Sequence, residues 1–184
     1  MAKHKKQIEY RYYEIPDGHY VMALLGETWV RSYGAEQENL LHFHNYMEIG
    51  YCYWGNGQLT IEESTVPYKG GLITIIPENI PHETKSYNHG ICKWEYLYID
   101  IDSFIRNEMQ FKRMLPEEVI KRLNNHGYVI QWNQNKVMAN IIKNIIEEYR
   151  ETKPYYKEAV KGYLRAFVVE LLRINEDMSS SLTL

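Results

Sequence analysis

The chain has 184 residues, of which 45% are hydrophobic and 24% are charged, a composition that excludes disordered and fibrous proteins. Its formal net charge of -3 has the wrong sign for a chain that binds the phosphate backbone of a nucleic acid by itself, so direct DNA binding is not expected. The apolar runs are too short to span a bilayer and the first residues lack the apolar core of a secretion signal, so we expect a cytoplasmic protein with no membrane partner.

Short β-like runs separated by turn signals occupy the first half of the chain. Many short strands at this spacing predict a sandwich or a barrel, and therefore a mainly β fold. Gly55-Asn56-Gly57 predicts a tight hairpin turn, because glycine and asparagine adopt positive φ at low cost. The strongest runs are residues 20–25, 48–54, 58–61, 72–76 and 94–101.

The pattern changes after residue 102. Residues 103–115 and 117–125 have the character of short helices, and Pro116 is placed where it can open the second one. Residues 128–132 form either a returning strand or an extended link, because their apolar run is too short to decide between the two.

Two long amphipathic helices follow. Apolar residues recur every three to four positions over 137–149 and again over 156–172, with a break at Pro154. Proline cannot continue the first helix but fits the first turn of the second, so we expect an antiparallel helix pair at 133–175. The small, polar segment 176–184 then has the composition of a linker.

The second long helix has an apolar face wider than one contact with the rest of the chain would hide. At roughly 1.5 to 3 kcal/mol for each large side chain taken from water, leaving four or five of them exposed would forfeit on the order of 10 kcal/mol. We therefore expect a second copy to cover this face, and the alternative is a helix buried within its own chain. The predicted dimer interface consists of Tyr156, Val160, Tyr163, Leu164, Phe167 and Leu171.

Three histidines and one glutamate occur at a spacing that brings them together on strands. The sequence reads His42-x-His44-x3-Glu48, and His82 follows more than thirty residues later. Side chains two or four positions apart on a strand project from one face, so a β-barrel could gather all four at one interior point. They could hold a divalent transition metal such as zinc, nickel, manganese or iron, and without an ion they would form the polar floor of a small-molecule pocket, with Glu48 paired to a histidine. Any metal would be held by nitrogen and oxygen, because no thiol metal motif is present.

Strand alternation extends this pocket. Trp54 shares the face of Glu48 if no bulge intervenes, which makes it a candidate for stacking against a sugar ring. Trp94, Tyr96 and Tyr98 share a face of a later strand, although ordinary core packing is the alternative for each. Arg11 or Arg31 could supply a donor to an anionic or hydroxylated ligand.

The spacing of these residues is similar to the two sequence motifs of the cupin superfamily. The chain departs from the motifs at Asn79, where cupins usually have glycine, and at Ser86, where they usually have asparagine, which weakens the prediction of metal chemistry more than that of the fold. The matching positions are His42, His44, Glu48, Gly55, Gly71, Pro77 and His82.

With the trailing helix pair included, nearly the whole chain resembles the amino-terminal sensing domain of AraC-family transcriptional regulators. The resemblance implies a cupin-like double-stranded β-helix (jelly-roll) barrel with an amino-terminal arm and short helices at 1–132, a helical dimerisation hairpin at 133–175 and a linker at 176–184. It also implies that residues 8–13 either form the first strand or close over a bound effector. DNA would be read only by helix-turn-helix motifs after Leu184.

Together these observations predict a non-enzymatic sensor that binds a small molecule, often a sugar or a related metabolite, and forms a homodimer. A metal-dependent cupin enzyme, such as an isomerase or dioxygenase, is the alternative, and a dimerisation domain with a vestigial pocket is a third reading. The long helix pair, which a compact enzyme barrel does not require, favours the sensor. The predicted effector pocket consists of Tyr12, His42, His44, Glu48, Trp54, His82, Trp94 and Tyr96.

Overall fold

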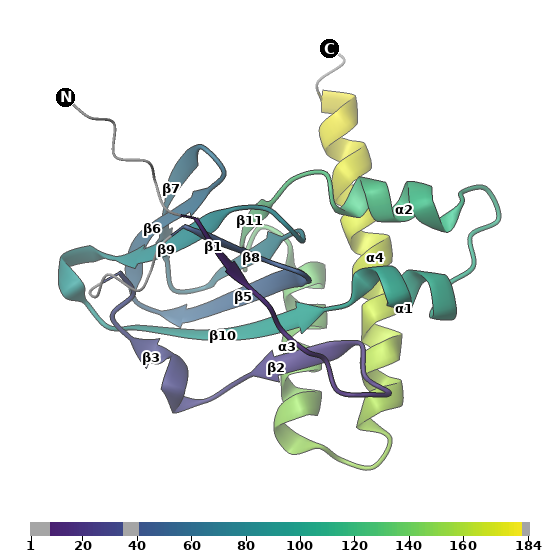
Figure 1. Cartoon of the computed structure of the whole chain (residues 1–184), viewed down its shortest axis with the longest axis horizontal. Coiled ribbons are helices and arrows are strands. Elements are labelled where there is room, and N and C mark those ends of the chain that lie inside the picture. The colour runs from purple at the N-terminus through teal and green to yellow at the C-terminus, as the bar shows by residue number, and fades with distance from the viewer. Residues whose placement is uncertain (1–7, 35–40, 182–184) are drawn as a thin grey trace.

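The computed structural model describes residues 8–34 and 41–181, with side chains through residue 176. The described strands form two sheets that face each other (Figure 1). Sheet A has the order β1 (Glu9–Arg11), β4 (His42–His44), β9 (His82–Ser86), β6 (Asn56–Ile61) and β7 (Ser64–Lys69). Sheet B has the order β11 (Tyr128–Gln131), β8 (Leu72–Ile76), β5 (Met47–Trp54), β10 (Cys92–Ile99) and β2 (Val21–Leu24), and β3 (Val30–Arg31) also pairs with β10.

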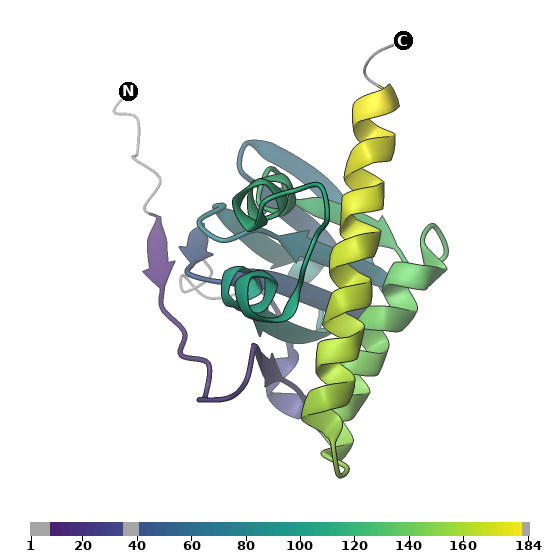
Figure 2. The same cartoon turned by 90° about the vertical axis from the view of Figure 1, so that its right-hand side faces the viewer.

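The helices cover the outer face of sheet B, so this sheet lies between sheet A and the helical layer (Figure 2). The helices are α1 (Ile101–Glu108), α2 (Pro116–Leu123), α3 (Lys136–Glu151) and α4 (Tyr156–Ser181), and two 3-10 turns, η1 (Glu27–Trp29) and η2 (Tyr87–His89), occur in the loops. The predicted mainly β fold with carboxy-terminal helices is confirmed.

Side-chain alternation along the strands of sheet B separates two hydrophobic clusters. Cys52 and Trp94 lie between the sheets, whereas Ile49 and Leu97 pack against the helices. The predicted division of β5 into two faces is therefore confirmed, and Glu48 points into the space between the sheets.

The predicted hairpin at Gly55-Asn56-Gly57 is wrong. The strands on either side, β5 and β6, belong to different sheets, so the glycines form a corner rather than a two-stranded turn. Gly55 has φ of 101°, which glycine adopts without strain. A Cβ on Gly57 would lie 1.9 Å from the Lys85 carbonyl oxygen, so only glycine fits at this point of the β6–β9 pair.

Capping residues define the helix starts. Asp100 and Asn135 accept hydrogen bonds from the backbone of Ser103 (3.0 Å) and Met138 (2.9 Å), and Pro116 opens α2 as predicted. The first short helix begins two residues earlier than predicted and ends at Glu108. The expected linker at 176–184 is helical through Ser181, because polar, small residues can extend a helix that packing has already nucleated, and residues 182–184 lie outside the described part.

The width of the apolar face of α4 has a different cause from the one predicted. Four of the proposed interface residues, Val160, Leu164, Phe167 and Leu171, are 0–4% exposed and belong to the core that α4 shares with α3 and sheet B. Tyr156 and Tyr163 are partly buried. The chain itself therefore covers this face, which was the alternative considered from the sequence.

Within the described residues, none of the helices combines the length and the apolar character needed to cross a lipid bilayer.

Candidate functional site

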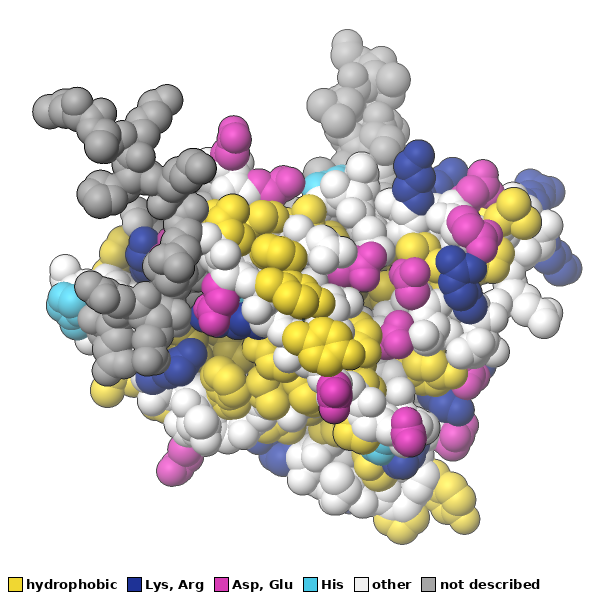
Figure 3. Space-filling view, viewed as in Figure 1, with side chains coloured by type: hydrophobic (Ala, Val, Ile, Leu, Met, Phe, Trp, Pro, Cys, Tyr) yellow, Lys and Arg dark blue, Asp and Glu magenta, His cyan; other side chains and the backbone are white. Residues whose placement is uncertain are grey.

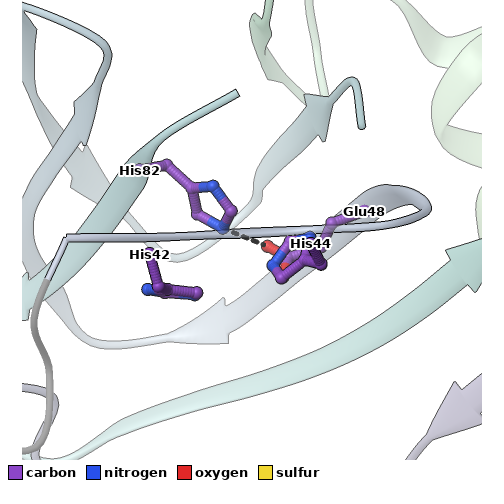
Figure 4. Close-up of side chains that lie close together, drawn as sticks. All are labelled: His42, His44, Glu48 and His82. Atoms are coloured by element: carbon purple, nitrogen blue, oxygen red, sulfur yellow. Dashed lines mark ion pairs between the residues drawn. The ribbon is translucent and has the colours of Figure 1, made fainter. Parts of the chain in front are cut away.

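The four predicted ligand residues converge between the two sheets (Figure 4). His42 on β4 lies directly opposite His82 on β9, and His44 follows two positions along β4. Glu48 comes from β5 in the facing sheet. One ligand atom from each residue lies within 4.8 Å of the others, so the predicted convergence is confirmed.

A backbone hydrogen bond of His82 determines which of its ring nitrogens faces the cluster. His82 Nδ1 lies 2.9 Å from the Ile80 carbonyl oxygen, which can only accept, so Nδ1 carries a proton and donates it. His82 Nε2 lies 3.6 Å from Glu48 Oε1, and His44 Nε2 lies 3.1 Å from Glu48 Oε2. Neither of these Nε2 atoms has a hydrogen-bond partner of suitable geometry among the described residues. In a neutral His82 the nitrogen that faces Glu48 is an acceptor, so a proton on that nitrogen or a metal ion is needed between it and the carboxylate. Neither ring nitrogen of His44 has a hydrogen-bond partner among the described residues, so a neutral His44 can carry its proton on Nε2, toward Glu48.

Glu48 is held in its ionised form. Burial alone would raise its pKa, but the adjacent His82 and His44 more than offset that effect and hold the pKa well below the usual range. The Tyr98 hydroxyl, which lies opposite Glu48 on β10, donates to Oε2 at 3.0 Å. An ionised carboxylate in a buried site is the form that binds a metal or a cationic imidazole.

The donor set fits a divalent transition metal. Three imidazole nitrogens and one carboxylate are typical ligands for such ions, and the backbone hydrogen bond of His82 is the kind of outer interaction that orients a metal ligand. His42 is partly exposed toward the adjoining pocket, whereas the other three residues are buried. A bound ion would therefore lie at the inner end of that pocket.

A pocket of about 200 Å³ opens beside the cluster between the sheets. At ~30 Å³ per water molecule, it has room for about seven waters, about the size of a monosaccharide. It is lined by Arg11, Tyr13, Trp29, Arg31, Tyr33, His42, Glu48, His82, Glu83, Thr84, Tyr96 and Tyr98.

The structure places three predicted pocket residues elsewhere. Trp54 is 66% exposed, because it ends β5 six residues beyond Glu48, ~20 Å along the strand at ~3.3 Å per residue. Trp94 is 1% exposed and forms the core beneath the pocket, where it stacks on Tyr96 with ring centroids 5.8 Å apart. Tyr12 is 63% exposed. Tyr96 lines the pocket with His42, Glu48 and His82, while His44 lies behind them in the cluster.

The arm contributes Tyr13 in place of Tyr12. Asn45 holds its backbone through two 3.0 Å hydrogen bonds, and its ring stacks on Tyr98 with centroids 3.9 Å apart. The strand β1 ends at Arg11, so strand alternation could not indicate which tyrosine turns inward. Tyr98 lines the pocket beside Tyr96, with which the sequence places it on one strand face.

Residues 27–33, which include η1 and β3, supply Trp29 and Tyr33, which the sequence did not indicate, and Arg31, one of the two candidate donors. Trp29 meets Tyr96 edge to face at 5.4 Å. No periodic pattern marks this segment, so Arg31 could be named from the sequence only as one of two candidate donors.

Hydrophobic side chains gather over β1 on the face shown in Figure 3. Ile8, Tyr10 and Tyr12 are 48%, 51% and 63% exposed there, and Tyr10 packs on Phe43 with ring centroids 5.1 Å apart. The outward-facing tyrosines of the arm thus form a surface patch, and Tyr13 alone of the arm tyrosines enters the pocket.

Residues 30–168 match the sequence model of the AraC-like ligand binding domain. The chain belongs to this family. The match includes the whole His/Glu cluster and both sheets apart from β1 and β2. The predicted resemblance to the sensing domain of AraC-type regulators is therefore confirmed. A search of curated proteins found no match.

A solved structure shows the same fold at low sequence identity. ToxT from Vibrio cholerae strain SCE256, solved with a bound unsaturated fatty acid, is 12% identical over 85% of this chain and 54% of ToxT, with a TM-score of 0.54. The chain thus spans about half the length of ToxT. The AraC-like transcriptional activator CuxR is 11% identical over 68% of this chain and 42% of CuxR (TM-score 0.44), and a cupin 2 conserved barrel domain protein from Salinispora arenicola CNS-205 is 14% identical over 44% of this chain and 74% of that protein (TM-score 0.32).

Proposed function

We propose that this chain is the effector-sensing part of an AraC-type regulator and that its effector is a small polar metabolite, such as a sugar or a related compound. The observation that supports this most strongly is the polar pocket of about 200 Å³ between the sheets of a chain that matches the ligand-binding family. Bound effector would contact both the arm, through Tyr13, and β10, through Tyr96. Only a ligand with unequal affinity for two states of the domain can regulate it.

A titration with small metabolites tests this proposal. An effector present at about 100 times its Kd stabilises the folded state by about 2.7 kcal/mol, which corresponds to a rise of about 5–10 °C in Tm for a chain of this size. Intrinsic tryptophan fluorescence is the second readout, because Trp29 lines the pocket. If neither signal responds to any sugar, sugar acid or related metabolite, the sensor proposal is contradicted.

We further propose that His42, His44, Glu48 and His82 hold one divalent transition metal. The buried, converging nitrogens support this, and the ion would supply Lewis-acid chemistry or a coordination site for the effector. Elemental analysis after metal loading should give about one ion per chain for the natural sequence. Glu48→Gln should lose it, while the matched change His89→Gln, at an exposed histidine outside the cluster, should not. Equal loading of the natural chain and Glu48→Gln would contradict this site.

The metal-dependent cupin enzyme remains the second candidate, and the same four ligands support it. Turnover of a substrate by the metal-loaded chain, abolished in Glu48→Gln, would favour the enzyme. Family membership favours the sensor, which needs binding but no reaction.

We also propose two macromolecular partners, a second copy of this chain and DNA. Two copies would associate through the outer face of the α3–α4 hairpin, and DNA would be bound only by a further domain of a longer protein. The exposed side chains of Val137, Ala166 and Val169 on this face support the first of these.

A further inference from the structure

Among the described residues, the charges that line the pocket are not all balanced. Glu48 is paired with His44 and His82, and Glu83 is paired with Lys85 at 2.8 Å. Arg11 is paired with Glu9, also at 2.8 Å. Within residues 8–34 and 41–176, no carboxylate forms an ion pair with Arg31.

Arg31 is nevertheless held at the rim of the pocket. Its guanidinium carbon lies 5.3 Å from the Trp29 ring centroid and 4.9 Å from the Tyr33 ring centroid, so cation–π contacts with two aromatic rings hold it there. Tyr33 is itself buried, and its hydroxyl donates to the Trp29 carbonyl oxygen at 3.1 Å. A guanidinium held by aromatic rings still has N–H donors for a carboxylate, which it can bind through two parallel hydrogen bonds.

The rest of the lining fits hydroxyl groups. Thr84, Tyr96 and His42 offer polar atoms around a space of about 200 Å³. A divalent ion at the His/Glu cluster would make the pocket more positive. Three neutral imidazoles and one carboxylate would leave the loaded cluster with a net charge of +1.

We infer that the effector is a compact, hydroxylated carboxylic acid of monosaccharide size, and that Arg31 is the residue that selects the acid over its neutral parent. This inference rests on the proposed sensing function and narrows its ligand class. The carboxylate would bind at the rim beside Arg31, with the hydroxyl groups directed toward Thr84, Tyr96 and His42.

Matched pairs of probes test the inference on the full 184-residue chain. D-galacturonate and D-glucuronate differ from D-galactose and D-glucose only at the carbon that carries the carboxylate. Calorimetry should show tighter binding of the acids, by about 10- to 100-fold, because a hydrogen bond to a charged group contributes ~1.5–3 kcal/mol and 1.4 kcal/mol is a tenfold change. Repeating the titrations with EDTA separates the contribution of Arg31 from that of any bound ion.

Variants supply the controls. Arg31→Gln should bring the affinity for the acids down to that for the neutral sugars, and Arg31→Lys should retain part of the difference. Arg113→Gln, at an exposed arginine outside the pocket, should bind all four probes as the natural chain does.

Equal affinity for acids and neutral sugars, or unchanged acid binding by Arg31→Gln, would overturn the inference and leave the sensor proposal standing. Failure of all four probes would also overturn it. In that case a thermal response to another class of metabolite would preserve the sensor proposal, and the absence of any response would end both.

Discussion

At the scale of single residues, the absence of a side chain at Gly50 lets the barrel interior close. A Cβ at this position would lie 2.5 Å from Thr74 Oγ1 and 3.1 Å from the Trp94 ring. Trp94 in turn stacks on Tyr96, which lines the pocket. The glycine therefore positions a pocket residue through the buried indole beneath it.

We predict that Gly50→Ala lowers the free energy of unfolding by about 1–3 kcal/mol, the usual cost of adding a methylene to a filled core. Gly162→Ala is the matched control, because no atom lies within 4 Å of its added Cβ and it is in the exposed interior of α4. That change should stabilise the chain by about 1 kcal/mol. Urea unfolding of both variants checks the prediction, and equal stability of Gly50→Ala and the natural chain would contradict it.

At the scale of secondary-structure elements, an ion pair fastens α3 to the barrel. Glu95 is 2% exposed on the helix-facing side of β10, and its carboxylate lies 2.8 Å from Arg150 Nη2 in the last turn of α3. It also accepts hydrogen bonds from the Tyr53 hydroxyl and from the backbone of Gly26. Burial alone would raise the pKa of Glu95, but these partners lower it below the ordinary value of 4.5.

The two single substitutions of this pair should differ in cost. Arg150→Gln leaves a buried carboxylate without its charge partner and should destabilise the fold by about 3–5 kcal/mol. Glu95→Gln leaves only an arginine that is 39% exposed and can be hydrated, so it should cost about 1–3 kcal/mol. Guanidinium chloride unfolding at pH 7 measures both, and a larger cost for Glu95→Gln would reverse the argument.

The same pair predicts a pH dependence. Because the pKa of Glu95 is lower in the folded than in the unfolded chain, the unfolded chain binds more protons as the pH falls below 4.5. The stability that Glu95 contributes is therefore fully present above that pH and is lost as the pH falls through the folded pKa. The difference in unfolding free energy between the natural chain and Glu95→Gln should shrink steadily from pH 5 to pH 3. A constant difference over this range would show that the ionised Glu95 carboxylate is not the source of the stabilisation.

The elements differ in how much of them the sequence could predict. In β6 exposed and buried residues alternate, because one face is open to solvent, and this pattern identifies both the strand and its orientation. All five residues of β8 are buried, because sheet B is covered on both sides, so its sequence indicates a strand but not its faces. The His/Glu cluster was predictable because strand spacing determines it, whereas Tyr13, Trp29 and Arg31 lie where no repeat constrains the chain.

At the scale of the whole molecule, the helical layer and sheet B share one hydrophobic core, so the hairpin is not an appendage on a finished barrel. The wide apolar face of α4 reflects this arrangement rather than a partner. The surface left for a second copy is the opposite stripe of α4, with Gly162, Ala166 and Val169 at its centre. Asn135 donates to Glu170 at 2.9 Å, so the exposed Val137 at the start of α3 lies near this stripe.

An antiparallel pairing of two such stripes about Ala166 would be self-complementary. Positions at similar distances from the centre meet across a two-fold axis, so Glu158, eight residues before Ala166, would lie near Arg173 of the other copy, seven residues after it. The small residues at Gly162 and Ala166 would allow the two helices to approach closely.

We predict that the double change Ala166→Glu and Val169→Glu converts a dimer into a monomer with little effect on folding, because both positions are exposed. Leu164→Ala is the contrasting variant. It should lower the free energy of unfolding by about 2–5 kcal/mol, because Leu164 is fully buried within the chain, without a selective effect on association. Sedimentation equilibrium measures the oligomeric state, and urea unfolding measures the fold. A natural chain that is monomeric at micromolar concentration, or a double variant that still dimerises, would show that the outer stripe of α4 is not an interface.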